Sequence, residues 1–123
     1  MAEHLRRNAL DFFAEAEHDI KNGKYNLALF HLEQALQLAP KHALFQLKGG
    51  FTKTHDVLRP LDEIIEPTRS ERLRRIRNEE ASTLEAIRPY ITSRYLPFDA
   101  DRPVVERAYN VVKAILNELG LVE

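Results

Sequence analysis

The chain has 123 residues, of which 44% are hydrophobic and 30% charged, so we expect one folded domain over residues 1–123 rather than a disordered chain. Its 18 basic and 19 acidic residues give a formal net charge of -1, which argues against a strongly cationic nucleic-acid binder. The absence of Cys excludes disulfides, thiolate metal sites and Cys nucleophiles. No apolar run approaches the roughly 18 residues of a membrane span, and the first residues lack the apolar core of a signal peptide, so a cytoplasmic protein is expected.

Helical periodicity dominates the first half of the chain. Apolar residues recur every three or four positions over residues 5–20, which predicts an amphipathic helix that Asn22-Gly23 ends. A second helix is expected over residues 25–47. Its apolar residues lie almost all round, so it should be central and touch several neighbours. Pro40 lies inside this pattern and should kink the helix or divide it after residue 39.

Three further helices are predicted in the second half. One begins near Thr54, a suitable N-cap, and is closed by Pro67. The next begins between residues 70 and 79 and ends near Arg94. The last is capped by Asp101 and stopped by Gly120, with apolar steps of three and four between them. Since no stretch alternates with period two, we expect an all-α fold: an antiparallel up-and-down bundle of about five helices.

The charges are unevenly distributed, and residues 67–94 hold seven Arg against four Glu. Five of these arginines lie close together and are called the arginine strip: Arg69, Arg72, Arg74, Arg75 and Arg77. Arginine suits phosphate recognition because its donors form a planar fork. Glutamates interleave with the strip, however, and we favour a solvated helix face over a phosphate site.

No catalytic or metal-binding motif is found: the sequence has no Gly-rich phosphate loop, GxSxG or HExxH. Glu15 and Asp19 lie near His18 in the sequence, and we interpret these neighbours as surface pairs. We therefore expect no metal and no other cofactor. His31 stands on an otherwise apolar helix. Together with Gln34 it is interpreted as a polar group of the core or of a dimer interface.

Residues 16–40 resemble one tetratricopeptide motif, with small residues and the terminal Pro40 where that repeat has them. The resemblance implies a helical adaptor that holds a peptide in a groove. It also requires a turn at Pro40. A single repeat cannot bury its own face, and the rest of the chain offers no second copy.

Four other elements follow one another along the chain: a turn before a Tyr, a Gln-Ala pair with a later Lys, a Thr-His-Asp helix start, and an Arg-Tyr-Pro-like element. They are Gly23 and Tyr25, Gln34-Ala35 with Lys41, Thr54-His55-Asp56, and Arg94-Tyr95 with Pro97. In this order and spacing the chain resembles the HEPN family (higher eukaryotes and prokaryotes nucleotide-binding domain), and the resemblance covers nearly the whole chain. It departs from the family pattern at Leu96, which is inserted before Pro97, at Gln37, where a Glu is common, and at Pro40.

The HEPN resemblance implies a helical bundle that is frequently a homodimer and is often found beside a small nucleotidyltransferase partner, in toxin–antitoxin-like pairs. Our first hypothesis is therefore a homodimer that binds a nucleotide, such a partner, or both. Arg94 and Lys41 would bind the anion, Tyr95 would stack on a base, and His55 would act near the helix start. The apolar second helix also favours a dimer, because a small bundle could leave part of it uncovered.

Many members of the HEPN family are metal-independent RNases that carry an Arg followed, after four to six residues, by a His. This signature is absent, because His55 is the last His and the arginines before it, Arg6 and Arg7, lie ten or more residues ahead of the next His. We therefore expect no catalytic residues and no ribonuclease activity, and nucleic acid is not an expected partner. An atypical RNase that pairs His55 with Arg94 is a further alternative.

Overall fold

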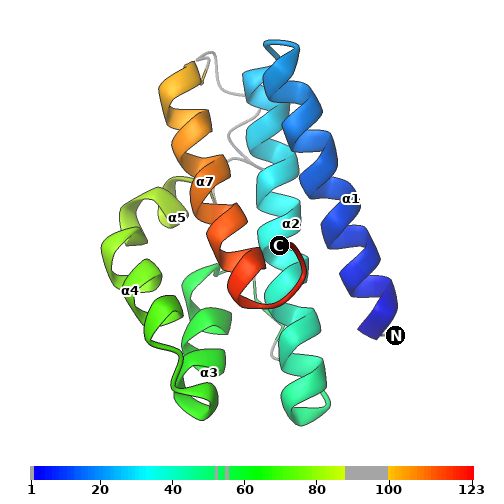
Figure 1. Cartoon of the computed structure of the whole chain (residues 1–123), viewed down its shortest axis with the longest axis vertical. Helices are drawn as coiled ribbons and strands as arrows, with labels where there is room; N and C mark the ends of the chain where they lie inside the picture. The colour runs from blue at the N-terminus through cyan, green and yellow to red at the C-terminus, as the bar shows by residue number, and fades with distance from the viewer. Residues whose placement is uncertain (1, 52, 55, 88–99) are drawn as a thin grey trace.

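The computed structural model describes residues 2–51, 53–54, 56–87 and 100–123 (Figure 1). Within these residues it is all-α and contains no strand, as the periodicity predicts. The helices are α1 (Ala2–Lys21), α2 (Tyr25–Lys48), α3 (Leu58–Thr68), α4 (Glu71–Glu79), α5 (Ala81–Ile87) and α7 (Arg102–Glu118). None of these helices combines the length and the hydropathy needed to cross a bilayer.

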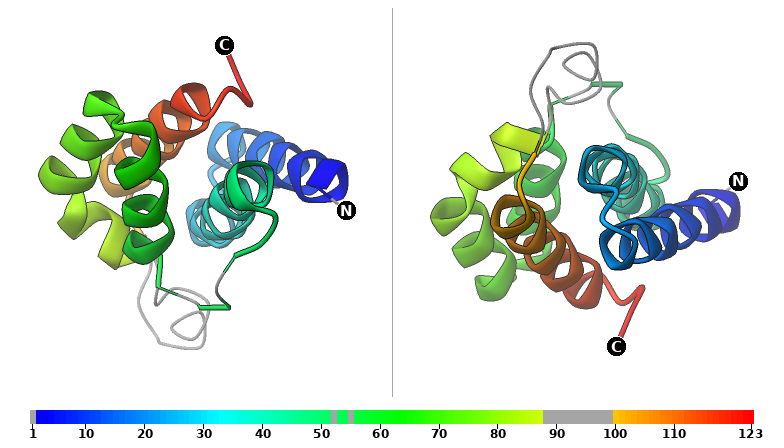
Figure 2. Two further views of the ribbon diagram at one scale, coloured as in Figure 1. Left: turned by 90° about the horizontal axis from the view of Figure 1, so that it is seen from below. Right: turned by 90° about the horizontal axis from the view of Figure 1, so that it is seen from above.

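The helices form an up-and-down bundle around α2. In Figure 1, α1 runs upward, whereas α2 and α7 run downward beside it. α2 contacts α1, α3, α5 and α7, and α1 packs chiefly on α2. The end-on views in Figure 2 show α1 on one side of the molecule and α4 on the other, with α2 and α7 between them. The second helix is therefore central, as its apolar pattern predicts.

α2 continues through Pro40 to Lys48, and Gly49, with a φ of 75°, caps it by donating its backbone N–H to the carbonyl of Phe45. Pro40 is itself buried within the helix. The helix therefore covers the expected residues 25–47 and is not divided after residue 39. This contradicts the turn at Pro40 that the tetratricopeptide interpretation requires.

Local side-chain hydrogen bonds fix several helix ends. Asp101 caps α7 as predicted, because its carboxylate accepts the backbone N–H of Val104. The helix expected to begin near Thr54 begins instead at Leu58. The Thr54 hydroxyl accepts the N–H of Asp56, and the Asp56 carboxylate accepts the N–H of Leu58, so these residues form turns before the helix.

The fourth predicted helix is two helices in the structure. α4 ends at Glu79, and Glu80 breaks the helical path with a φ of -110° and a ψ of 18° before α5 begins. The predicted end near Arg94 lies outside the described residues. α3 also continues one residue beyond Pro67 and is closed by Arg69 in a left-handed conformation.

The chain's own helices bury nearly half of the 24 residues of α2. Eleven of its residues are buried, and Leu27 and Leu47, near its opposite ends, are its exposed large apolar side chains. The described part of the chain therefore does not show the uncovered apolar face on which the sequence argument for a dimer rested. The homodimer stays a prediction of the family resemblance.

Candidate functional site

Four polar side chains are buried in the described core: Asp19, Glu33, Gln37 and His42. Three of them belong to α2, the most enclosed helix of the bundle. Burial of a charged group is costly unless hydrogen bonds or an opposite charge compensate for it. These residues are therefore the part of the core whose chemistry needs an explanation.

Glu33 is the most buried of the four, with 1% of its surface exposed. Burial raises the pKa of its carboxyl group to about 7, although hydrogen bonds from Gln37 and Gln34 and the positive charge of Lys41 act in the opposite direction. The Gln34 side-chain amide donates to a Glu33 carboxylate oxygen at 3.1 Å. α2 thus carries a carboxyl group that changes protonation near neutral pH.

Glu33, Gln37 and Lys41 are spaced four residues apart and so share one face of α2. Lys41 is half-buried, and its ammonium nitrogen stands 5.7 Å from the centroid of the Phe51 ring. Phe51 belongs to the connection between α2 and α3, which also carries Thr54 and Asp56. Two of the four HEPN-like elements, the Gln-Ala-Lys element and the Thr-His-Asp element, therefore lie on neighbouring segments.

Three of the four predicted nucleotide-binding residues, His55, Arg94 and Tyr95, lie outside the described residues. The structure therefore places only Lys41 of that set.

The two residues predicted to be core or interface polar groups are both half-buried inside the monomer. His31 Nδ1 lies 2.6 Å from a carboxylate oxygen of Asp19, which comes from α1. The imidazole stacks on Phe12 with ring centroids 5.9 Å apart and touches Phe30 at 5.4 Å. Gln34 is the amide that donates to Glu33.

The arginine strip is largely paired within the chain. Three of its members lie within 2.7 to 3.5 Å of a carboxylate oxygen: Arg72 with Glu118, Arg74 with Glu71, and Arg77 with Asp62. Exposed pairs of this kind contribute little stability, but they partly neutralise the charge of these three arginines and occupy some of their donors. This supports the interpretation of the strip as a solvated face.

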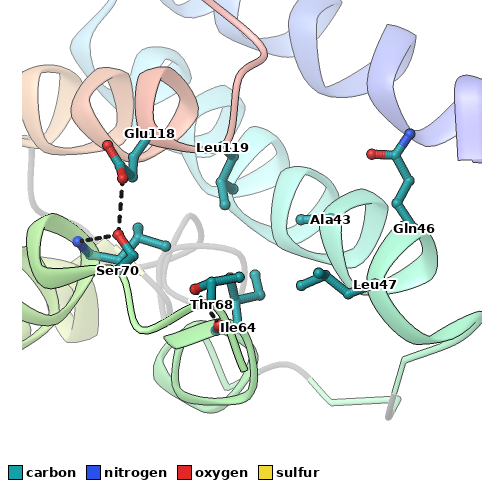
Figure 3. A pocket seen from close by; sticks show the side chains of 9 residues that line it. Ala43, Gln46, Leu47, Ile64, Thr68, Ser70, Glu118 and Leu119 are labelled. Carbon is teal, nitrogen blue, oxygen red and sulfur yellow. Dashed lines mark hydrogen bonds between the residues drawn. The ribbon is translucent and has the colours of Figure 1, made fainter. Parts of the chain in front are cut away.

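A cleft of about 410 Å³ opens between the end of α2, α3, the start of α4 and the end of α7 (Figure 3). Its size suits a small ligand, but the polar groups of Thr68, Ser70 and Glu118 on its wall already have partners. The Ser70 hydroxyl donates to Glu118 at 2.9 Å, and the Thr68 hydroxyl donates to the Ile64 carbonyl at 2.7 Å (Figure 3). We therefore do not place a functional site in this cleft.

Sequence reasoning missed the Asp19–His31 pair and the importance of Glu33. A lone carboxylate in the apolar pattern of α2 was the available signal for Glu33. The Asp19–His31 contact joins residues twelve positions apart across the α1–α2 turn, so only the geometry of the hairpin reveals it.

Comparison with known proteins gives one family match. The model of the HEPN domain family matches residues 2–122, essentially the whole chain. No curated protein and no solved structure matches it.

Proposed function

Because the chain belongs to the HEPN domain family, we propose that it is a binding domain that takes a nucleotide beside the Lys41 end of α2. In this proposal Lys41 and Arg94 bind phosphate, Tyr95 stacks on the base, and His55 contributes from the α2–α3 connection. A cation, a guanidinium fork and one aromatic face supply the main contacts that a nucleotide needs.

The contact between Lys41 and Phe51 carries this proposal. It holds the Lys41 ammonium beside Phe51, on the connection whose sequence carries the Thr-His-Asp element three residues further on. The charge of Lys41 also suits an incoming anion. Glu33, whose pKa is about 7, carries only part of a negative charge at neutral pH and so only partly offsets the positive charge of Lys41.

The proposal does not include ribonuclease chemistry. RNA cleavage by acid–base catalysis needs an accessible group that titrates near neutral pH beside a cation that holds the phosphate, and the Glu33 carboxyl group, with 1% of its surface exposed, is enclosed in the core. The Arg-x4-6-His signature that provides these groups in many HEPN RNases is absent from the sequence.

We further propose that the domain associates as a homodimer, with a small nucleotidyltransferase partner in a toxin–antitoxin-like pair, or both.

Calorimetric titration with ATP tests the nucleotide site. We expect Arg94→Ala and Lys41→Met each to weaken binding at least about tenfold, because each removes a charge-assisted contact with phosphate. Lys48→Met is the matched control. It removes a positive charge from the same helix, but Lys48 is at the end of α2 and lies 3.7 Å from a carboxylate oxygen of Glu63.

Two results would contradict the nucleotide proposal: no heat of binding for the wild type, or an equal loss of affinity in the Lys48→Met control. The same protein preparation should leave labelled RNA intact in the absence of metal. Cleavage that disappears in His55→Ala would instead support the atypical RNase that pairs His55 with Arg94.

A further inference from the structure

We propose that Glu15, Asp19 and His31 form a binding site for a divalent transition-metal ion of the Zn²⁺ class. One ligand atom from each of the three side chains lies within 4.8 Å of the others. Glu15 and Asp19 are four residues apart and so share one face of α1, while His31 comes from α2 across the hairpin. The inference is independent of the nucleotide site, which lies on a different part of α2.

The three side chains are held from both helices. Asp19 is 2% exposed, and its backbone carbonyl accepts the N–H of Lys24 at 2.8 Å, which fixes the last turn of α1 against the start of α2. The His31 ring is fixed by Phe12 and Phe30, which also shield it from water. Glu15 is exposed and can rotate. Two of the ligands are thus preorganised, and the third is free to close on an ion.

The charge of the site also favours a divalent cation. In the part of the chain that the structure describes, neither Glu15 nor Asp19 forms an ion pair with Lys or Arg. A protonated His31 would balance one of the two carboxylates, whereas a divalent cation would balance both.

The mixture of ligands indicates the class of ion. Mg²⁺ and Ca²⁺ take oxygen ligands, whereas an imidazole with two carboxylates suits Zn²⁺ and related first-row ions. Ligand atoms about 2.0 to 2.2 Å from a tetrahedral Zn²⁺ are roughly 3.3 to 3.6 Å apart. The Asp19–His31 distance of 2.6 Å would therefore open slightly, and the Glu15 carboxylate would move inward by rotation of its exposed side chain. Water would complete the coordination.

The competing explanation is that Asp19 and His31 form a hydrogen-bonded pair and bind no ion. Substitution of Glu15 distinguishes the two explanations, because only the metal site uses its carboxylate. Purified protein is stripped with a chelator and titrated with ZnCl₂, with calorimetry and thermal unfolding as readouts. We expect one equivalent of Zn²⁺ to bind and to raise the unfolding temperature. Glu15→Gln leaves the Asp19–His31 pair intact but should weaken Zn²⁺ binding at least about tenfold, as should His31→Gln.

His18→Gln is the essential control, because exposed His18 lies three residues from Glu15 and could form a surface site with it. Zn²⁺ binding that survives in His18→Gln and falls in Glu15→Gln supports the proposal, even if His31→Gln fails to fold. The proposal is overturned if the wild type does not bind Zn²⁺, if Glu15→Gln binds it normally, or if His18→Gln abolishes binding. An equal response to Mg²⁺ would also overturn it, since that would indicate general attraction to an acidic surface.

Discussion

The carboxyl group of Glu33 should make the stability of this domain depend on pH, and Glu33→Gln should remove that dependence. Glu33 is almost completely enclosed by the core, and burial raises its pKa from 4.5 to about 7. Gln has nearly the same shape and hydrogen-bonding capacity, but it carries no titrating proton. The substitution therefore isolates the effect of ionisation from the effect of packing.

The direction in which stability changes with pH follows from the raised pKa of Glu33. The folded state binds the proton more tightly than the unfolded state, so the contribution of Glu33 is fully present below pH 4.5 and is lost as the pH rises through 7. A shift of this size corresponds to about 3 kcal/mol in total. Between pH 5 and pH 8, the stability of Glu33→Gln relative to the wild type should rise by about 2 to 3 kcal/mol.

Urea unfolding of both proteins at pH 5, 6.5 and 8 measures this difference, because other titrating groups cancel when the two proteins are compared. Glu66→Gln, at an exposed position on α3, is the matched control and should show little change across the same range. A Glu33→Gln difference that stays constant within about 0.5 kcal/mol over the three pH values would refute the assignment of Glu33 as a buried, neutral-pH titrating group.

Two further predictions concern the junction of α3 and α4. Arg69 closes α3 with a φ of 56°, so Arg69→Gly should raise the free energy of unfolding by up to about 1 kcal/mol; a decrease in urea unfolding would contradict this. The Ser70 hydroxyl accepts the N–H of Leu73 at 3.2 Å and donates to Glu118 at 2.9 Å. Ser70→Ala should therefore lower stability by about 1 to 2 kcal/mol in the same assay, and a loss below about 0.3 kcal/mol would show that this cap is not important.

Much of the fold could be predicted from the sequence because the signals were local. The apolar spacing of α1 and α7, the Asp101 cap and the Asn22-Gly23 stop after α1 are signals carried by residues close together in the sequence. The break at Glu80 was not predictable in this way, because no Gly or Pro marks it. The delayed start of α3 came from side-chain turns at Thr54 and Asp56, which competed with the helix.

The candidate sites were harder to predict because they depend on contacts between helices. Glu15 and Asp19 were noted beside His18 along the chain, but the hairpin brings His31 to them instead. Lys41 was identified from the family pattern, whereas its contact with Phe51 required the path of the α2–α3 connection. The raised pKa of Glu33 required knowledge of how completely the surrounding helices enclose it.

The packing of α1 on the next helix in the chain has a consequence for folding order. Asn22 and Gly23 allow a tight reversal, so the largest helix–helix interface joins segments that are close in sequence. Contacts between such segments form with a small loss of chain entropy. The α1–α2 hairpin should thus be an early folding nucleus, and docking of α7 should be the later, slower event that completes the domain.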